Sequence, residues 1–217
     1  MHSYEEAYRM GQVRTAKITE PDDFIVSLAQ TLRRKGCQAV LDVGCGAGRN
    51  AVFLAEEGFH VVGVDMSPTA LELALGKAKS KSVKRCVFVK HDFLELPFPD
   101  AHFDAAFSCY AIENMPMSEI EKALSEMRRV VEDDGLILVT LHSPKHWRFG
   151  QGKEVERNTF MVLDKIKGKT VRFITHFFEK KDAETLFQNL DLKILSIKEQ
   201  VKVSDKQRAH WVVLSRK

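Results

Sequence analysis

Three closely spaced glycines, Gly44, Gly46 and Gly48, are the residues whose type and spacing most directly indicate ligand binding. They follow the apolar segment 39–43, so a strand there would end in a backbone that turns sharply and approaches a ligand closely. Asp65 ends the next apolar segment, about 20 residues further on. A carboxylate in that place can accept hydrogen bonds from both hydroxyls of a ribose. The pattern predicts a site for a nucleoside-containing cofactor, with a glycine-rich turn and a capping aspartate as the structural alternative.

Two classes of cofactor use a loop of this kind. Dinucleotide enzymes carry the pattern G-x-G-x-x-G, whose third glycine permits close packing of a helix on a strand. Here the pattern is G-x-G-x-G, and Arg49 stands where that third glycine would be. No lysine follows the glycines as it does in a P-loop, so we do not expect a nucleoside-triphosphate site. A nicotinamide-dependent oxidoreductase stays open as an alternative function.

Candidates for a general base or a substrate contact are His142, His176, Tyr110 and Glu113. His142 follows the apolar segment 135–141, at the edge of a sheet where ligands collect, and a half-buried polar cap is its alternative role. His142 and His146 have the i, i+4 spacing of a helical metal site, but Pro144 between them argues against a helix. We therefore predict no metal site, and no catalytic residue is assigned.

The composition is that of an ordinary globular protein: 217 residues, of which 44% are apolar and 29% charged. The net charge of +3 is too small to argue for nucleic acid by bulk electrostatics, and a solvated helix end accounts for the lysine run of residues 77–85. The four cysteines form no C-x-x-C pair, which favours a reducing compartment. Charges occupy the N-terminus where a signal peptide needs an apolar core, and no apolar run is long enough for a membrane span. We expect a cytoplasmic protein without a nucleic-acid or membrane partner, and its oligomeric state stays open.

The elements that must position these residues alternate along the chain. Apolar runs predict strands over residues 39–43, 61–65, 87–90, 103–110 and 135–141. Helical spacing predicts helices over residues 22–34, 49–57 and 118–131, and another that begins at Pro68 with Ser67 as its cap. Strands that are apolar on both faces and alternate with helices predict a parallel sheet covered on both sides.

The C-terminal part differs from this alternation. A helix over residues 181–190 precedes strands over 192–199 and 209–215, and the polar connection between the strands is too short for a parallel crossover. We therefore expect one α/β domain over residues 1–217 with a three-layer, Rossmann-like fold of about seven strands, mostly parallel, whose last strand is antiparallel. Residues 143–178 are too long for an ordinary loop, and strands over 159–163 and 170–174 predict a hairpin insertion that forms part of a lid.

With these motifs in place, the sequence resembles the class I S-adenosylmethionine-dependent methyltransferases. The resemblance covers residues 39–141 best and rests on Asp42-Val43-Gly44-Cys45-Gly46-Ala47-Gly48, Asp65, His91-Asp92-Phe93 and Phe103-Asp104. Within the family, the chain looks like small-molecule methyltransferases of the tellurite-resistance type. That narrower resemblance rests on Gly152-Lys153-Glu154, Asn158-Thr159-Phe160, His176-Phe177-Phe178 and Trp211-Val212-Val213-Leu214.

The resemblance implies roles for single residues of the glycine segment and the second strand. Gly44 and Gly46 would approach the methionyl portion and the ribose of S-adenosylmethionine, and Asp65 would bind the ribose hydroxyls. Met66 would pack on the adenine, although a core role is equally normal for methionine. The same motif adds three residues to the expected cofactor site: Asp42, Cys45 and Gly48.

Further residues of the expected cofactor site follow the third and fourth strands. Asp92 would accept a hydrogen bond from the adenine amino group, and Phe93 beside it would offer a backbone amide. A turn aspartate is the alternative for Asp92. Cys109 would lie near the methionyl end, with a buried small residue as its alternative role. Tyr4 and Tyr8 would close over the cofactor or pack on the surface.

The activity that the resemblance implies is methyl transfer from S-adenosylmethionine to a small-molecule acceptor. This is an in-line displacement in which the enzyme aligns nucleophile, methyl and sulfur and excludes water. A general base helps when the nucleophile must lose a proton, whereas a soft thiolate or chalcogen anion needs none. Ser108-Cys109-Tyr110-Ala111 stands where nucleic-acid amino methyltransferases carry an Asn-Pro-Pro-Tyr-like stretch, which argues against base methylation. A binding module that holds the cofactor without transferring a methyl is the second alternative.

Overall fold

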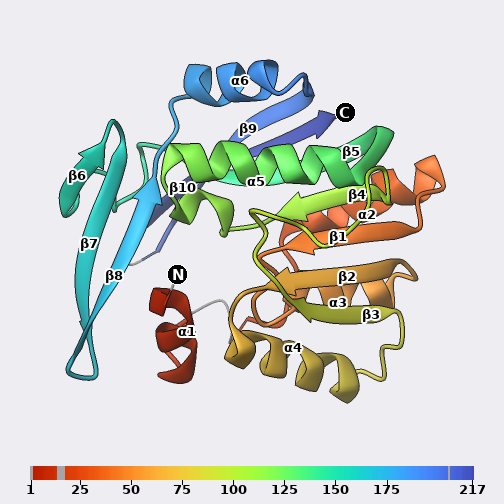
Figure 1. Cartoon of the computed structure of the whole chain (residues 1–217), viewed down its shortest axis with the longest axis horizontal. Coiled ribbons are helices and arrows are strands. Elements are labelled where there is room, and N and C mark those ends of the chain that lie inside the picture. The colour runs from red at the N-terminus through yellow and green to blue at the C-terminus, as the bar shows by residue number, and fades with distance from the viewer. Residues whose placement is uncertain (1, 14–17, 205) are drawn as a thin grey trace.

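A computed structural model describes residues 2–13, 18–204 and 206–217 of the chain. Within these residues, the main sheet has seven strands in the order β3-β2-β1-β4-β5-β10-β9 (Figure 1). In chain order the strands are β1 (Ala39–Val43), β2 (His60–Asp65), β3 (Cys86–Lys90), β4 (Phe103–Ser108), β5 (Val131–His142), β9 (Lys193–Val203) and β10 (Gln207–Arg216). The predicted α/β, Rossmann-like fold is confirmed.

The first five strands are parallel, and nearly all apolar side chains of β1, β4 and β5 are buried on both faces of the sheet. Val40 packs with helices α2 (Asp23–Lys35) and α3 (Arg49–Glu56), whereas its neighbour Leu41 packs with α5 (Met117–Val130) and α6 (Lys180–Asn189). Both side chains are fully buried. This alternation explains the continuous apolar runs, because a strand covered on both faces has no side that can be polar.

Helix α4 (Pro68–Ser80) begins where the sequence predicts it. Ser67 is its N-cap, and the Ser67 hydroxyl accepts a hydrogen bond from the backbone N–H of Ala70 at 3.0 Å. Pro68 occupies the first helical position, where the missing N–H costs nothing. The cap matters for function because Ser67 lies only two residues beyond the carboxylate of Asp65, at the end of β2.

The last strand is reversed, as the short polar connection predicts. β9 ends at Val203 and β10 begins at Gln207, and the two strands pair antiparallel. β10 lies between β9 and β5 and is antiparallel to both. The parallel set of strands therefore ends at β5, so the carboxyl ends of β1, β2, β4 and β5 meet at one edge of the sheet.

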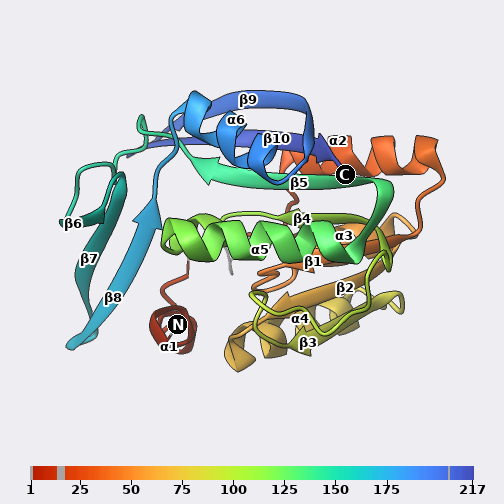
Figure 2. The same cartoon turned by 45° about the horizontal axis from the view of Figure 1, so that its top comes forward.

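Three strands form a second, antiparallel sheet within the segment from residue 143 to residue 178: β6 (Lys153–Glu156), β7 (Thr159–Ile166) and β8 (Lys169–His176). β7 and β8 make a hairpin whose two turn residues, Lys167 and Gly168, have φ of 46° and 81°. Positive φ at both positions matches the twist that a two-residue hairpin needs. β6 is short and fully exposed, which is why no apolar pattern predicts it. Figure 2 shows this sheet beyond the carboxyl ends of the parallel strands.

A helix at the start of the chain, α1 (His2–Arg9), lies beside the hairpin (Figures 1 and 2). No element is predicted there, because eight largely polar residues show too little apolar periodicity to indicate a helix. In the structure Ala7 is buried against Val171 and Phe173 of β8, and the ring of Tyr4 meets that of Phe173 edge-on at 5.4 Å. Contacts with distant parts of the chain therefore hold the helix in place.

Three expected boundaries are wrong by several residues. β4 ends at Ser108 rather than at residue 110, because Tyr110 has a φ of 59° and turns the chain out of the sheet. β5 starts at Val131 rather than at residue 135, directly after the last residue of α5. β9 continues to Val203 rather than ending at residue 199. In the part of the chain that the structure describes, every helix is too short or too polar to cross a membrane.

Gly48 offers a test of how the glycine segment supports the fold. It is the N-cap of α3 with a φ of 71°, and an added Cβ would lie 2.8 Å from the Cβ of Ala74 and 3.0 Å from the ring of Phe88. We expect Gly48→Ala to lower the free energy of unfolding by about 1–3 kcal/mol, measured by urea denaturation. The control is Gly76→Ala, at an exposed position inside α4 where an added Cβ meets no described atom within 4 Å. The free energy of unfolding of Gly76→Ala should rise by about 0.5–1 kcal/mol. Equal free energies of unfolding for the two variants would contradict the packing role of Gly48.

Candidate functional site

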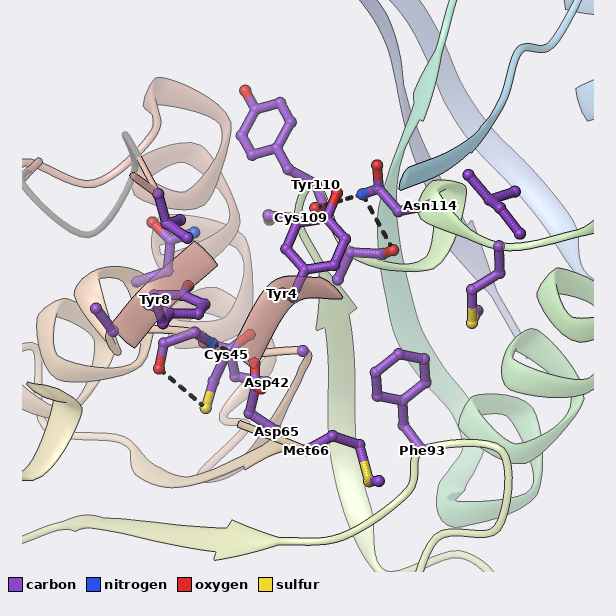
Figure 3. Close-up of a pocket in the computed structure, with 18 of the residues that line it drawn as sticks. Tyr4, Tyr8, Asp42, Cys45, Asp65, Met66, Phe93, Cys109, Tyr110 and Asn114 are labelled. Atoms are coloured by element: carbon purple, nitrogen blue, oxygen red, sulfur yellow. Dashed lines mark hydrogen bonds between the residues drawn. The ribbon is translucent and has the colours of Figure 1, made fainter. Parts of the chain in front are cut away.

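A cavity of about 290 Å³ opens at the carboxyl ends of β1, β2 and β4 (Figure 3). The main sheet supplies its floor, α1 and β8 face that floor, and the turn after β4 forms one side. The residues lining it are Tyr4, Tyr8, Val13, Asp42, Gly44, Cys45, Gly46, Ala47, Arg49, Asn50, Asp65, Met66, Phe93, Cys109, Tyr110, Ala111, Asn114, Met115, Pro116, Glu119, Arg172 and Ile174. The structure thus brings together most of the residues that the sequence predicts for the cofactor.

The glycine loop between β1 and α3 lies against the cavity. Gly44 and Gly46 have φ of 73° and 53°, a conformation that side chains rarely adopt. A Cβ on Gly44 would lie 2.3 Å from the Cβ of Ala111, and one on Gly46 would lie 2.4 Å from the Tyr8 hydroxyl oxygen. Both positions therefore need glycine, because neighbouring groups approach the loop backbone this closely.

Asp65 connects this loop to the second strand and to α4. One carboxylate oxygen accepts a hydrogen bond from the backbone N–H of Gly46 at 2.8 Å, and the other accepts one from the backbone N–H of Ser67 at 2.8 Å. Burial raises the pKa of Asp65 and outweighs these hydrogen bonds, and the nearby Glu5 adds to the rise. A carboxylate has about four lone-pair sites, so two remain for hydroxyl donors of a ligand.

Asp42 and the two cysteines lie on the same floor. Burial is the main reason why the pKa of Asp42 stands well above its usual range, and the charge of Asp65 raises it further while Arg49 opposes the rise. The pKa of the Cys45 and Cys109 thiols is likewise raised well above the usual range by burial. Burial thus disfavours the charged forms of these three groups, and thiols with raised pKa are poor nucleophiles.

Met66 and Phe93 line the cavity, whereas Asp92 and Gly48 are not among the described residues that do. The Asp92 carboxylate accepts a hydrogen bond from the backbone N–H of Leu94 at 2.9 Å, so it acts as a turn aspartate in this structure. Gly48 faces Ala74 and Phe88, away from the cavity. The adenine contact of Asp92 and the cofactor contact of Gly48 stay predictions.

Several cavity residues escaped the sequence analysis. Arg49, the first residue of α3, lines the cavity and forms an ion pair with Asp22 in which both side chains are about nine-tenths buried. Tyr110 lies beside this pair, with its hydroxyl 3.5 Å from the Asp22 carboxylate and 3.3 Å from His210 Nε2. An arginine directly after a glycine loop was the available signal for Arg49. Asp22 and His210 lie far from the loop in sequence, so no sequence signal connects them to it.

Helix α1 is fastened over the cavity by the carboxylate of Glu5. Its Oε2 accepts hydrogen bonds from the Ser67 hydroxyl at 2.5 Å and the Thr69 backbone N–H at 3.3 Å, and its Oε1 accepts one from the Thr69 hydroxyl at 2.7 Å. Burial alone would raise the pKa of Glu5, but these hydrogen bonds lower it overall. On the opposite side Glu6 forms an ion pair with Lys169 of the hairpin. Tyr4 and Tyr8 thereby face the cavity, as Figure 3 shows.

The acid–base candidates separate into two places. Glu113 is fully buried in a short 3₁₀ turn, Ile112–Asn114, next to cavity-lining Ala111 and Asn114, and its carboxyl Oε1 lies 4.0 Å from His142 Nε2. Tyr110 lines the cavity itself. His176 lies elsewhere, beside a second and more open cavity under the insertion, where its Nδ1 is 2.6 Å from the Thr159 hydroxyl.

His142 and His146 come together without sharing a helix. Their ring centroids are 4.6 Å apart, because the turn that follows β5 folds His146 back onto the end of the strand. Pro144 thus does not keep the two rings apart, and the absence of a helix over residues 143–146 agrees with its effect on the backbone. Among the described residues, no group of three or more histidines, cysteines or acids is arranged to hold a metal ion. Burial lowers the pKa of both rings, that of His146 to about 4, so both are neutral near pH 7.

Glu113 predicts a distinctive dependence of stability on pH. Burial raises its pKa to about 8, while the unfolded chain ionises near the usual value of 4.5. Its contribution to stability is therefore fully present below about pH 4.5 and is lost as the pH rises toward about 8. Glu113→Gln lacks this ionisable group. Between pH 5 and pH 8 we therefore expect the wild type to lose roughly 3 kcal/mol of unfolding free energy relative to Glu113→Gln, measured by urea titration. His142 and His146 have opposite effects on stability, but they are present in both proteins and cancel in the difference between the two unfolding free energies. A difference that stays constant with pH would contradict a buried, protonated Glu113.

The part of the chain that supplies most of this cavity is similar in sequence to known methyltransferases. Residues 40–135 match the family described as "Methyltransferase domain". An uncharacterized methyltransferase of Synechocystis sp. is 37% identical over 113 residues, which make up 52% of this chain and 51% of the relative. A demethylmenaquinone methyltransferase of Thermus thermophilus is 35% identical over 119 residues, 54% of this chain and 53% of the relative. The chain thus matches about half the length of these curated relatives.

Solved structures share the fold over a larger part of the chain. A structure titled as S-adenosylmethionine-dependent methyltransferases, from Methanosarcina mazei, has a TM-score of 0.76 and 22% identity and covers 91% of this chain and 98% of its own. The 1,6-didemethyltoxoflavin-N1-methyltransferase of Burkholderia thailandensis has a TM-score of 0.69 and 18% identity and covers 100% of this chain and 86% of its own. Residues 40–135 thus match the methyltransferase domain family, and the chain shares the fold of solved S-adenosylmethionine-dependent methyltransferases.

Proposed function

We propose that this protein is an S-adenosylmethionine-dependent methyltransferase that acts on a small-molecule acceptor. The observation that carries the proposal is the cavity in which Asp65, Gly44 and Gly46 meet at the ends of β1 and β2. The match of residues 40–135 to the methyltransferase domain family supports it. The cavity continues past Tyr110 and Asn114 toward β8, which leaves room for an acceptor beside the cofactor.

The residues present fit this cofactor. Gly44 and Gly46 line the cavity and carry no side chain, so the loop backbone can contact a ribose and a methionyl chain. Asp65 can accept hydrogen bonds from ribose hydroxyls while it keeps its own two backbone donors. Met66 and Phe93 offer apolar surface to an adenine. When bound, S-adenosylmethionine supplies a methyl group on a sulfonium, which leaves as a neutral thioether.

The chain's own residues then align the reactants and exclude water. Helix α1 and β8 face the sheet across the cavity, with Tyr4 and Ile174 among the side chains that separate its interior from solvent. Alignment of this kind can supply much of the rate of a displacement, because it removes the entropy cost of bringing two molecules together. Burial raises the pKa of the Cys45 and Cys109 thiols, so neither presents a competing thiolate to the methyl group near neutral pH.

A small organic acceptor agrees with the names of the proteins to which the chain is similar. The Thermus thermophilus relative is named for demethylmenaquinone, and the Burkholderia thailandensis structure holds 1,6-didemethyltoxoflavin and S-adenosylhomocysteine. The narrower resemblance to the tellurite-resistance type stays a prediction that rests on short C-terminal motifs. It implies a chalcogen acceptor, and the acceptors named here are of a different chemical class.

Turnover and equilibrium binding test the proposal against its two alternatives. Purified protein should bind S-adenosylhomocysteine saturably in calorimetry and transfer labelled methyl from S-adenosylmethionine to at least one member of a panel of hydroxyl, amine and thiol acceptors. Saturable binding of NADH without binding of S-adenosylhomocysteine would favour the oxidoreductase. Tight binding of S-adenosylhomocysteine without any transfer would favour a binding module.

Replacement of Asp65 tests the cofactor site directly. Asp65→Ala removes the acceptor for ribose hydroxyls and releases the backbone of Gly46. We expect the affinity for S-adenosylhomocysteine to fall by about 1–3 kcal/mol, or roughly 5–150-fold. Asp23→Ala, on the exposed side of α2, is the control and should bind like the wild type. An unchanged dissociation constant for a folded Asp65→Ala protein would show that the nucleoside binds elsewhere.

We further propose that α1 and the β7–β8 hairpin form a lid over the bound cofactor. The two segments hold each other through the ion pair of Glu6 with Lys169 and the packing of Tyr4 on Phe173. Glu5 fastens this unit to Ser67 and Thr69 at the start of α4. Because Tyr8 lies close to Gly46, movement of α1 away from the loop would widen access to the cofactor site.

Loss of the Glu5 carboxylate should therefore open the lid. Glu5→Ala removes the hydrogen bonds to Ser67 and Thr69, and we expect S-adenosylhomocysteine to dissociate at least about threefold faster in stopped-flow experiments, since each such bond contributes about 1 kcal/mol. Arg9→Ala, on the exposed side of the same helix, is the control for helix propensity. Identical dissociation rates for Glu5→Ala and the wild type would contradict the proposal that α1 forms part of a lid.

A further inference from the structure

Most of the charged side chains that line the cavity already interact with other groups of the chain, or burial disfavours their charged form. Arg49 takes part in the buried ion pair described above, and both carboxylate oxygens of Asp65 accept hydrogen bonds from the backbone. Burial raises the pKa of Asp42 well above its usual range. Two charged side chains of the cavity lining remain, Arg172 of β8 and Glu119 of α5.

The two remaining charges differ in how the fold accounts for them. Glu119 lies in the first turn of α5, where the exposed N–H groups at the start of a 14-residue helix make a negative charge favourable. Arg172 has no such counterpart. The basic residues of the segment from residue 143 to residue 178 that form ion pairs are Lys145, Arg148, Arg157 and Lys169, and none of the ion pairs among the described residues includes Arg172. The positive charge of Arg172 is therefore available to a ligand.

The alternation of side chains along β8 places Arg172 at the cavity. Val171 and Phe173 are buried against α1, whereas Arg172 and Ile174 line the cavity. Successive side chains of a strand point to opposite faces, so Arg172 shares its face of the hairpin with Ile174. Arg172 is exposed and Ile174 is half-buried. The guanidinium therefore lies at the mouth of the cavity, and the isoleucine lies further in.

The acceptor end of the cavity is otherwise largely apolar or aromatic. Its surfaces come from Tyr4, Met115, Pro116 and Ile174, of which Met115 is buried and the others are half-buried. Asn114 adds an amide, but its nitrogen already donates to two backbone carbonyls, at 2.9 and 3.3 Å. An acceptor that fills this end therefore needs an apolar or aromatic body, and a charged substituent at its outer end would meet Arg172.

The charges around Tyr4 favour an anion at this end of the cavity. Burial raises the pKa of the Tyr4 phenol, and the positive charge of Arg148 opposes this rise more than the negative charge of Glu113 adds to it. Burial also raises the pKa of Glu113 to about 8, which favours its uncharged form. Arg148 and Arg172 thus supply positive charge on the lid side, and the start of α5 offsets the negative charge of Glu119 on the other.

We propose that Arg172 determines acceptor specificity by binding a carboxylate at the end of an apolar or aromatic acceptor that is remote from the methylated atom. The inference rests on the proposed methyltransferase function and names the class of acceptor. A guanidinium presents its N–H donors in a rigid fork that matches the two oxygens of a carboxylate. One arginine balances the single charge of a carboxylate, whereas a phosphate monoester carries nearly two charges. Glu119, at the same end of the cavity, weakens the binding of the carboxylate by repulsion.

Matched pairs of acceptors measure the contribution of the carboxylate. Each pair presents the same nucleophile without and with a carboxylate: catechol and protocatechuate, aniline and para-aminobenzoate, thiophenol and para-mercaptobenzoate. In every pair that the wild type methylates, we expect the lower KM for the acid. Arg172→Gln should raise the KM for the acid by about 5–30-fold with little change in kcat, and it should leave the KM for the neutral partner unchanged. Arg172→Lys keeps the charge but not the fork and should lie between the two proteins.

Control variants separate this effect from a general change in charge. Lys165→Gln removes a positive charge from an exposed position of β7 in the same hairpin and should behave like the wild type. Glu119→Gln should lower the KM for the acids, which is the opposite of the effect of Arg172→Gln. Added salt should raise the wild-type KM for the acids more than for their neutral partners, and this difference should shrink in Arg172→Gln. The affinity of Arg172→Gln for S-adenosylhomocysteine in calorimetry should equal that of the wild type.

The possible outcomes distinguish the inference from the function on which it rests. A wild type that methylates only neutral or cationic acceptors, or that shows no lower KM for the acids, would overturn the inference and leave the proposed function intact. The same holds for an Arg172→Gln protein that raises both KM values of a pair equally. Absence of transfer from S-adenosylmethionine to every acceptor would instead overturn the proposed function, and the inference with it.

Discussion

The carboxylate of Asp65 is the group on which the site depends, because it joins three separate parts of the fold. Its two oxygens hold the backbone N–H groups of Gly46 and Ser67, each at 2.8 Å. The first bond fixes the glycine loop relative to β2, and the second fixes the start of α4. Ser67 in turn donates to Glu5, which fastens α1. A single buried carboxylate therefore links the cofactor loop to the element that covers it, and a nucleoside that binds there meets an arrangement that already exists.

Burial raises the pKa of Asp42 and Glu113, as it does that of Asp65. Asp42 is buried beneath the loop, and Glu113 is buried behind the turn after β4, so the pKa of each stands well above its usual range. A buried charge is costly unless it is paired, so burial favours the neutral form of both carboxyls. Asp22 differs from these two carboxyls, because its buried side chain forms an ion pair with Arg49.

The parts of the fold that the sequence predicted are those with strong local signals. Apolar runs marked the parallel strands, Ser67 and Pro68 marked the start of α4, and the short connection after β9 marked the reversed strand. Asp65 and the glycines were predictable for the same reason, since a chemical requirement acts on residues close together in the chain. Helix α1 and strand β6 were missed because contacts with distant residues stabilise them. Glu113 and His142 were each candidates, but their pairing depends on how the turn after β4 packs against β5, and no spacing in the sequence records that.

The position of Glu113 also bears on how the cavity is divided between its two ligands. Glycine-loop residues and Asp65 lie at one end, whereas Asn114, Met115 and β8 lie at the other, with Cys109 and Tyr110 between them. Tyr110 is held in its left-handed conformation on one side by the Thr140 hydroxyl and on the other by the Asp22 and His210 cluster. The same threonine contacts Glu113. The turn after β4 and the buried Glu113 therefore share the Thr140 side chain as support, so a change at Thr140 affects both.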